Sequence, residues 1–174
     1  DGSWDGYTER PAMVMEGYTV LAEECRATFS ETGLWPSHVM LQAGVGGMAA
    51  AVAGHIRTCW AEQPTVIVVE PDRAPCLLES VRAGHMVRAD GDISNMGRLD
   101  CKEASLLAFE SLRRDADLFV TVTDAEAQAA ADRFTAHGAA TTPSGAAGLA
   151  GLQHLTARDQ ASCLIIVSEG PEVA

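Results

Sequence analysis

The sequence predicts an α/β protein with a doubly wound, mostly parallel sheet and helices on both faces of that sheet. Short apolar runs rich in β-branched residues alternate along the chain with longer segments that have helical spacing. The run Thr65 to Val69 (TVIVV) is continuously β-branched, which is typical of a strand covered on both faces. With 174 residues, 47% of them hydrophobic, the chain fits one globular domain.

The first predicted elements are a helix, a strand, a glycine turn and a second helix. From Pro11 to about Glu31 the apolar residues recur at helical spacing, and Gly33 is placed to end that helix. The run His38 to Ala43 (HVMLQA) predicts a strand that stops at Gly44. Met48 to Trp60 then has the alanine-rich character of a helix.

After the strand at Thr65 to Val69 we predict a short helix from Ala74 to Arg82. Ala83 to Cys101 is rich in Gly and Asp and has the least regular pattern, which predicts a long loop. The remaining predicted elements are a helix over Glu103–Arg114, a strand over Leu118–Val122, a helix capped by Asp124 that runs to about His137, a helix from Pro143 to about Leu155 and a strand over Cys163–Val167.

Composition excludes several classes of partner. The formal net charge is −12 and no cluster of Lys or Arg is present, which argues against binding to nucleic acid or to an anionic membrane surface. No apolar stretch is long enough to span a bilayer, and the first ten residues lack the features of a signal peptide. The five His and five Cys residues show no metal-ligand spacing, so we predict no metal site. We expect a soluble cytoplasmic protein that binds a small molecule.

The glycine turn from Gln42 to Met48 (QAGVGGM) is the main candidate binding motif. Between a strand and a helix, it gathers backbone N–H groups at the positive helix end, which suits a phosphate. Two other interpretations remain open at this point. Gly44, Gly46 and Ala49 satisfy the dinucleotide fingerprint, with Glu70 at the end of the next strand to meet a ribose of NAD. Alternatively, the glycines only let the helix pack closely on the sheet.

Segments along nearly the whole chain resemble the diaminopropionate ammonia-lyases, pyridoxal-phosphate (PLP) enzymes of the tryptophan-synthase-β (fold-type II) family. They are DGSWDGYT at 1–8, MEGYTVLAEE at 15–24, LQAGVGGM at 41–48, VEPDRAPC at 69–76, NMGRLDCKE at 95–103 and VSEG at 167–170. The resemblance implies that the PLP phosphate lies against Gly44, Val45, Gly46, Gly47 and Met48. NAD then becomes the runner-up cofactor.

The resemblance also implies two further site residues. Ser168 falls where a small hydroxyl residue meets the pyridine nitrogen of PLP, and a hydroxyl there moderates the electron sink as an elimination enzyme requires. Asp1 matches an acid/base aspartate of the family. The chain departs from the family at Thr142-Pro143, where an acidic residue is favoured, and at Gly97-Arg98 and Asp100, where smaller apolar residues are expected. These departures concern the substrate and leave the fold prediction unchanged.

The resemblance requires a Schiff-base lysine upstream of the glycine turn, whereas the only lysine here is Lys102. We interpret Lys102 as a solvated surface residue. Residues 1–174 are therefore expected to form a single α/β cofactor-binding domain, a carboxyl-terminal fragment that lacks the lysine-bearing part and the small domain and is inactive alone. Alternatively, a second chain supplies the lysine, or the protein is a decayed, noncatalytic relative.

The function implied by the resemblance is PLP-dependent α,β-elimination of ammonia from 2,3-diaminopropionate, giving pyruvate and ammonia, in a homodimer. A serine/threonine or hydroxyaspartate dehydratase of the same family is the nearest alternative. A noncatalytic module that binds a phosphorylated ligand or NAD is the alternative from another class. Cys76 and Cys101 flank the predicted loop, where two free thiols are the expectation and a disulfide is the alternative.

Overall fold

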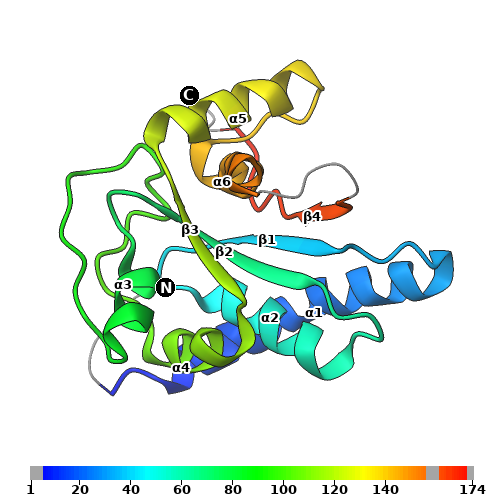
Figure 1. Cartoon of the computed structure of the whole chain (residues 1–174), viewed down its shortest axis with the longest axis horizontal. Coiled ribbons are helices and arrows are strands. Elements are labelled where there is room, and N and C mark those ends of the chain that lie inside the picture. The colour runs from blue at the N-terminus through cyan, green and yellow to red at the C-terminus, as the bar shows by residue number, and fades with distance from the viewer. Residues whose placement is uncertain (1–5, 156–160, 172–174) are drawn as a thin grey trace.

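A computed structural model describes residues 6–155 and 161–171 and shows a four-stranded sheet with helices on both faces (Figure 1). The strand order is β3-β2-β1-β4, and every neighbouring pair is parallel. The chain moves outward from β1 through β2 to β3 and then returns to place β4 on the other side of β1, which confirms the doubly wound prediction. The strands are β1 (His38–Gln42), β2 (Thr65–Pro71), β3 (Leu118–Val122) and β4 (Cys163–Ile165).

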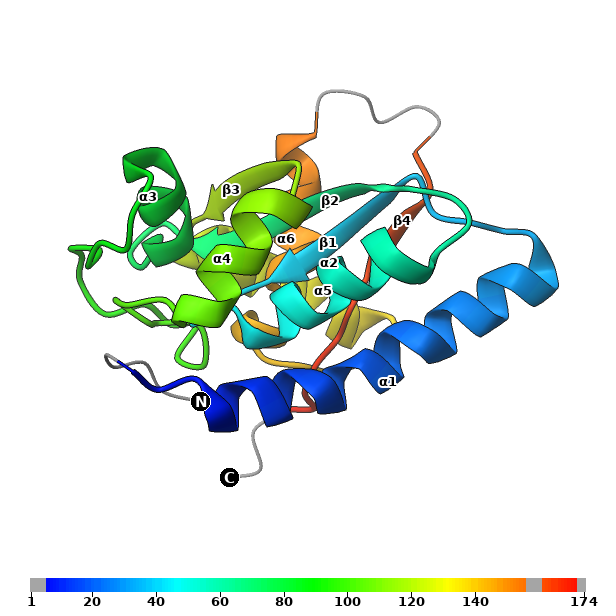
Figure 2. The ribbon, with the colours of Figure 1, turned by 90° about the horizontal axis from the view of Figure 1, so that it is seen from below.

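The helices form one layer on each face of the sheet. Helices α2 and α4 cover one face with α1 packed outside α2, while α5 and α6 cover the other (Figures 1 and 2). The helices are α1 (Glu9–Thr32), α2 (Gly47–Cys59), α3 (Cys76–Ala83), α4 (Leu106–Asp115), α5 (Asp124–Ala136) and α6 (Pro143–Gly151), followed by the 3₁₀ turn η1 (Leu152–His154).

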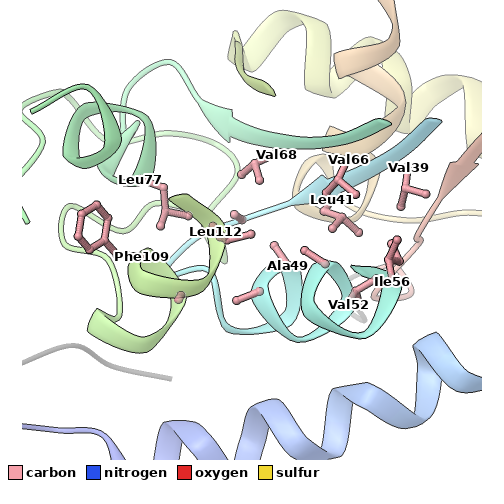
Figure 3. Packing of buried hydrophobic residues seen from close by; sticks show 14 of the residues in the cluster. Val39, Leu41, Ala49, Val52, Ile56, Val66, Val68, Leu77, Phe109 and Leu112 are labelled. Atoms are coloured by element: carbon pink, nitrogen blue, oxygen red, sulfur yellow. The ribbon is translucent and has the colours of Figure 1, made fainter. Parts of the chain in front are cut away.

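Each face of the sheet has its own hydrophobic core because successive strand residues point to opposite faces. In β2, Val66 and Val68 belong to the core beneath α2 and α4, whereas Ile67 and Val69 belong to the core beneath α5 and α6. All four are completely buried, as the continuous β-branched run predicted. The core on the first face is shown in Figure 3 and includes Val39, Leu41, Ala49, Val52, Ile56, Leu77, Phe109 and Leu112.

Several element boundaries differ from the prediction, and hydrogen bonds explain two of them. The N-cap of α5 is Thr123, which forms a capping box with Glu126, so Asp124 is the first helical residue and not the cap. Helix α4 begins at Leu106 and not at Glu103, because the N–H of Ser105 bonds the carbonyl of Val45 in the glycine turn at 2.9 Å. In addition, β4 ends at Ile165 and α6 at Gly151, both earlier than predicted.

The predicted loop is confirmed over residues 84–101 and continues to 105, and hydrogen bonds hold it in place. The Lys102 ammonium donates to the carbonyls of Arg73 at 2.7 Å and Asp92 at 3.0 Å and to the Asp100 carboxylate at 2.6 Å. Its side chain is 20% exposed. The interpretation of Lys102 as a solvated surface residue was therefore wrong, because its bond to Arg73 ties the loop to the segment between β2 and α3 and its bonds to Asp92 and Asp100 join two parts of the loop.

Cys76, at the start of α3, and Cys101, in the loop, are free thiols. In the described part of the chain, no helix has both the length and the apolar character needed to cross a bilayer.

Candidate active-site cleft

A cleft of about 800 Å³ opens at the carboxyl ends of β1 and β4. Strands β1 and β4 are neighbours in the sheet but are not consecutive in the chain. The chain leaves β1 towards β2 on one side of it and reaches β4, on the other side, only after β3, α5 and α6. Ligands of open α/β sheets bind at such a switch point. The lining residues that bear on its chemistry are Tyr18, the glycine turn from Ala43 to Met48, Arg98, Cys101, Ser168 and Glu169.

The amino-terminal end of α2 lines this cleft without a cap. Its N-cap position is Gly46, which provides no side chain to accept a hydrogen bond, and the first turn has no acidic residue. No other described residue accepts a hydrogen bond from the N–H groups of Gly46, Gly47 or Met48. These free donors, at the positive end of the helix dipole, suit the phosphate of a cofactor such as PLP.

Two of the glycines are also required by packing. Gly46 has a φ of +96°, and a Cβ there would lie 2.9 Å from the Ala108 Cβ and 2.9 Å from a Leu77 methyl group. A Cβ on Gly44 would lie 3.0 Å from both the Arg98 carbonyl oxygen and the Cys101 Sγ. These contacts are with α3, α4 and the loop and not with the sheet, so glycine is required at both positions for a different reason than close packing of the helix on the sheet.

Ser168 lies exposed in the cleft, on the segment that follows β4. Its Oγ accepts a hydrogen bond from the buried Gln42 Nε2 at 3.1 Å, and the same Nε2 donates to the Ile166 carbonyl at 2.8 Å. The amide orientation follows from these two acceptors. Because the Ser168 Oγ accepts from Gln42, its own hydrogen remains available to a ligand in the cleft.

Sequence reasoning assigned no role to Gln42, although its position as a polar residue at the end of a buried strand was a usable signal. It is 2% exposed, and its Oε1 has no hydrogen-bond partner among the described residues.

Glu70 does not line this cleft, contrary to its role in the NAD interpretation. Both carboxylate oxygens accept hydrogen bonds at the start of α3, from the N–H of Leu77 at 2.8 Å and from the N–H of Leu78 at 2.8 Å. Burial raises the pKa of Glu70 to about 7, and these two bonds oppose that rise. A carboxylate held in this way is not free to bind a ribose.

The two cysteines near the glycine turn are protonated thiols at neutral pH. Burial raises the pKa of Cys101, although the N–H of Val45 bonds its sulfur and opposes the rise. Burial, together with the neighbouring Glu70 carboxylate, also raises the pKa of Cys76. Neither thiol is therefore poised as a nucleophile. Asp1, the predicted acid/base residue, lies outside the described residues.

Comparison with known protein families gives a match over residues 5–169 to the family described as pyridoxal-phosphate dependent enzymes. Among curated proteins, the chain is 40% identical over 129 residues to diaminopropionate ammonia-lyase of Escherichia coli K12, covering 73% of this chain and 32% of that protein. It is 36% identical to the Salmonella typhimurium LT2 enzyme of the same name over 71% of this chain and 32% of that protein. The chain thus spans about a third of the length of these relatives.

Solved structures give the same fold. Diaminopropionate ammonia-lyase from Escherichia coli, in complex with an aminoacrylate-PLP azomethine reaction intermediate, superposes with a TM-score of 0.83 and 33% identity. The match covers 98% of this chain and 48% of that one. The L-serine ammonia-lyase from the fungus Rhizomucor miehei has a TM-score of 0.80 at 22% identity over 94% of this chain and 54% of its own, and shows the fold alone.

Proposed function

We infer the function from one premise: the chain belongs to the family of pyridoxal-phosphate-dependent enzymes. We propose that it is the cofactor-binding part of an ammonia-lyase that converts 2,3-diaminopropionate to pyruvate and ammonia by α,β-elimination. The observation that carries the proposal is the uncapped start of α2 in the switch-point cleft, which the Ser168 hydroxyl also lines. The 40% identity to a relative with that named activity supports the substrate.

In this proposal the residues of the cleft bind and orient the cofactor. The N–H groups of Gly46, Gly47 and Met48 bind the phosphate, with Gly44 and Val45 shaping the turn that presents them. Ser168 donates its hydrogen to the pyridine nitrogen, and the hydrogen bond from the Gln42 Nε2 holds the Ser168 Oγ in place. When bound, PLP supplies an electron sink for the negative charge that forms at the substrate α-carbon.

A hydroxyl at the pyridine nitrogen donates a hydrogen bond without transferring a proton fully, as a carboxylic acid would. The electron sink is then weaker, and loss of the β-amino group competes well with reprotonation of the α-carbon. Ser168 is thus proposed to favour elimination over other fates of the same carbanion.

We further propose that the Schiff-base lysine comes from polypeptide outside residues 1–174. Lys102 cannot fill this role without losing three hydrogen bonds, and it does not line the cleft. Asp1 is proposed as the acid/base group at the α-carbon, because it matches the aspartate of the family motif. By the same resemblance, we propose a single cofactor-binding domain here, completed by a small domain, in a cytoplasmic homodimer.

An absorbance titration of the natural full-length protein tests the function. We expect PLP to bind with a visible band, 2,3-diaminopropionate to shift that band, and pyruvate to be released in step with ammonia. Ser168→Ala should keep PLP bound but slow pyruvate release, whereas Ser30→Ala, on the exposed outer helix, should change neither. A protein that takes up PLP but leaves diaminopropionate intact would refute the proposed substrate, and one that binds no PLP would refute the proposal as a whole.

A further inference from the structure

Asp124 is a charged residue at the start of α5 whose side chain does not cap that helix. Thr123 and Glu126 form the capping box, which leaves the Asp124 carboxylate to other partners. The Asp124 side chain is 22% exposed and does not line the glycine-turn cleft. Its partners lie in the loop between α3 and α4, where Ser94 precedes it by 30 positions in the sequence.

Three groups share the two oxygens of this carboxylate. Oδ1 accepts hydrogen bonds from the Ser94 hydroxyl at 2.6 Å and from the Asn95 N–H at 3.1 Å. Oδ2 pairs with the Arg73 Nη1 at 3.1 Å, and the same nitrogen donates to the Ile93 carbonyl at 2.6 Å. The Asn95 side-chain amide also donates to the Asp124 carbonyl at 3.2 Å. Asp124 therefore holds residues 93–95 of the loop against the start of α5.

The same loop continues into one wall of the glycine-turn cleft. Its residues that line the cleft are Gly97, Arg98, Leu99 and Cys101. The loop bonds Val45, in the glycine turn, at both backbone groups: the Val45 N–H bonds the Cys101 sulfur, and its carbonyl accepts from the Ser105 N–H at 2.9 Å. The position of the glycine turn therefore depends on the loop, and residues 93–95 of that loop depend on Asp124.

A carboxylate suits this junction because it accepts several hydrogen bonds at once and its charge strengthens each of them. We propose that Asp124 is a positioning residue for the cofactor: by fixing the loop that bonds Val45, it places the N–H groups at the start of α2 that bind the phosphate. Asp124 itself does not contact the cofactor space. The part that concerns PLP rests on the proposed function, whereas the hold on the glycine turn is tested without a ligand.

The first measurement is hydrogen–deuterium exchange of the ligand-free, full-length protein, followed in peptides by mass spectrometry. Asp124→Ala removes the acceptor that holds the loop, so local opening becomes easier there. We expect exchange to be about fivefold faster, or more, in peptides covering residues 93–98 and 43–48. Residues 128–136, in the second half of α5, should keep the wild-type rate. Faster exchange confined to α5, or an unchanged rate in the glycine turn, would overturn the inference.

The second measurement follows PLP on the same full-length protein. The visible absorbance gives its dissociation constant, and the ³¹P chemical shift reports the surroundings of its phosphate. We expect Asp124→Ala to raise the dissociation constant about 10-fold and to move the ³¹P resonance. Asp124→Asn keeps an oxygen for Ser94 and Asn95 but loses the charge facing Arg73, so it should raise the constant only about 2- to 3-fold.

Two further variants serve as controls. Asp132 lies on the same helix, is exposed and bonds the Gln128 side chain at 3.0 Å, so Asp132→Ala should leave the exchange rates, the dissociation constant and the ³¹P shift unchanged. Ser94→Ala breaks one of the bonds that Asp124→Ala also breaks. Their effects on the dissociation constant should therefore be less than additive, and full additivity would count against the assigned contact.

A purely structural role has a different signature. Asp124→Ala would then unfold at a lower temperature but keep the wild-type dissociation constant and ³¹P shift, which would overturn the inference. Failure of the proposed function is recognised separately, because the wild-type protein would then bind no PLP. In that case the exchange rate of the glycine turn still decides whether Asp124 holds it in place.

Discussion

Gly46 at the start of α2 provides the sharpest test of how the cleft is built. In Gly46→Ala the residue must keep a φ of +96°, which costs an L-residue roughly 1–2 kcal/mol. Its Cβ would also lie 2.9 Å from the Ala108 Cβ, an atom that cannot move without its helix. Overpacking of this kind costs about 1–3 kcal/mol. We therefore expect Gly46→Ala to lower the free energy of unfolding by about 2–5 kcal/mol in total.

Gly84 separates the two contributions. It has a φ of +75°, but no atom lies within 4 Å of the position of an added Cβ. Gly84→Ala should therefore show only the backbone cost, and the gain from a less flexible unfolded chain is common to both variants. Urea unfolding followed by circular dichroism gives both values. Equal destabilisation of the two variants would refute the packing argument at Gly46.

Three other variants test the remaining interactions. Lys102→Met should destabilise the protein by about 1–3 kcal/mol in urea unfolding, because it removes three hydrogen bonds made by a charged donor; a loss under about 0.5 kcal/mol would contradict the role assigned to Lys102. Gln42→Leu should release Ser168 and shift the visible absorbance of bound PLP, and an unchanged spectrum would show that Gln42 does not position that hydroxyl. The pKa of Glu70 is raised to about 7 on folding, so the native state holds this proton more tightly than the unfolded chain does. The free energy of unfolding should therefore fall between about pH 4.5 and 7, by up to roughly 3 kcal/mol, and then level off. That slope should disappear in Glu70→Gln, and its persistence would assign it to other groups.

Most of the fold could be predicted because its signals are local. The β-branched run of β2 indicates a strand buried on both faces wherever it occurs, and the structure places Val66 to Val69 completely inside. The glycine turn is also a local signal, because only glycine adopts the φ of Gly46 without strain. The boundaries were less predictable. Helix α4 starts late because Ser105 bonds Val45, a partner 60 residues away that no local pattern reveals.

The unpredicted part of the site consists of contacts between residues far apart in the chain. Gln42 and Ser168 meet only because β1 and β4 are neighbours in the sheet, since the two residues are 126 positions apart in sequence. Lys102 resembled a surface lysine because two of its three acceptors are backbone carbonyls, which have no sequence signature. The motif resemblance predicted a set of cofactor-binding residues but not the side chains that hold them.

The uncapped start of α2 makes the stability of this protein a function of what it has bound. Without a ligand, the amide groups at the start of α2 are solvated by water, and the helix dipole there is not neutralised. An anion that binds only the folded chain adds a free energy of RT ln(1 + [L]/Kd), which is about 2.7 kcal/mol at a hundredfold excess over its Kd. The melting temperature would therefore report cofactor loading, and a cell short of the cofactor would hold a less stable and more rapidly degraded form of this protein.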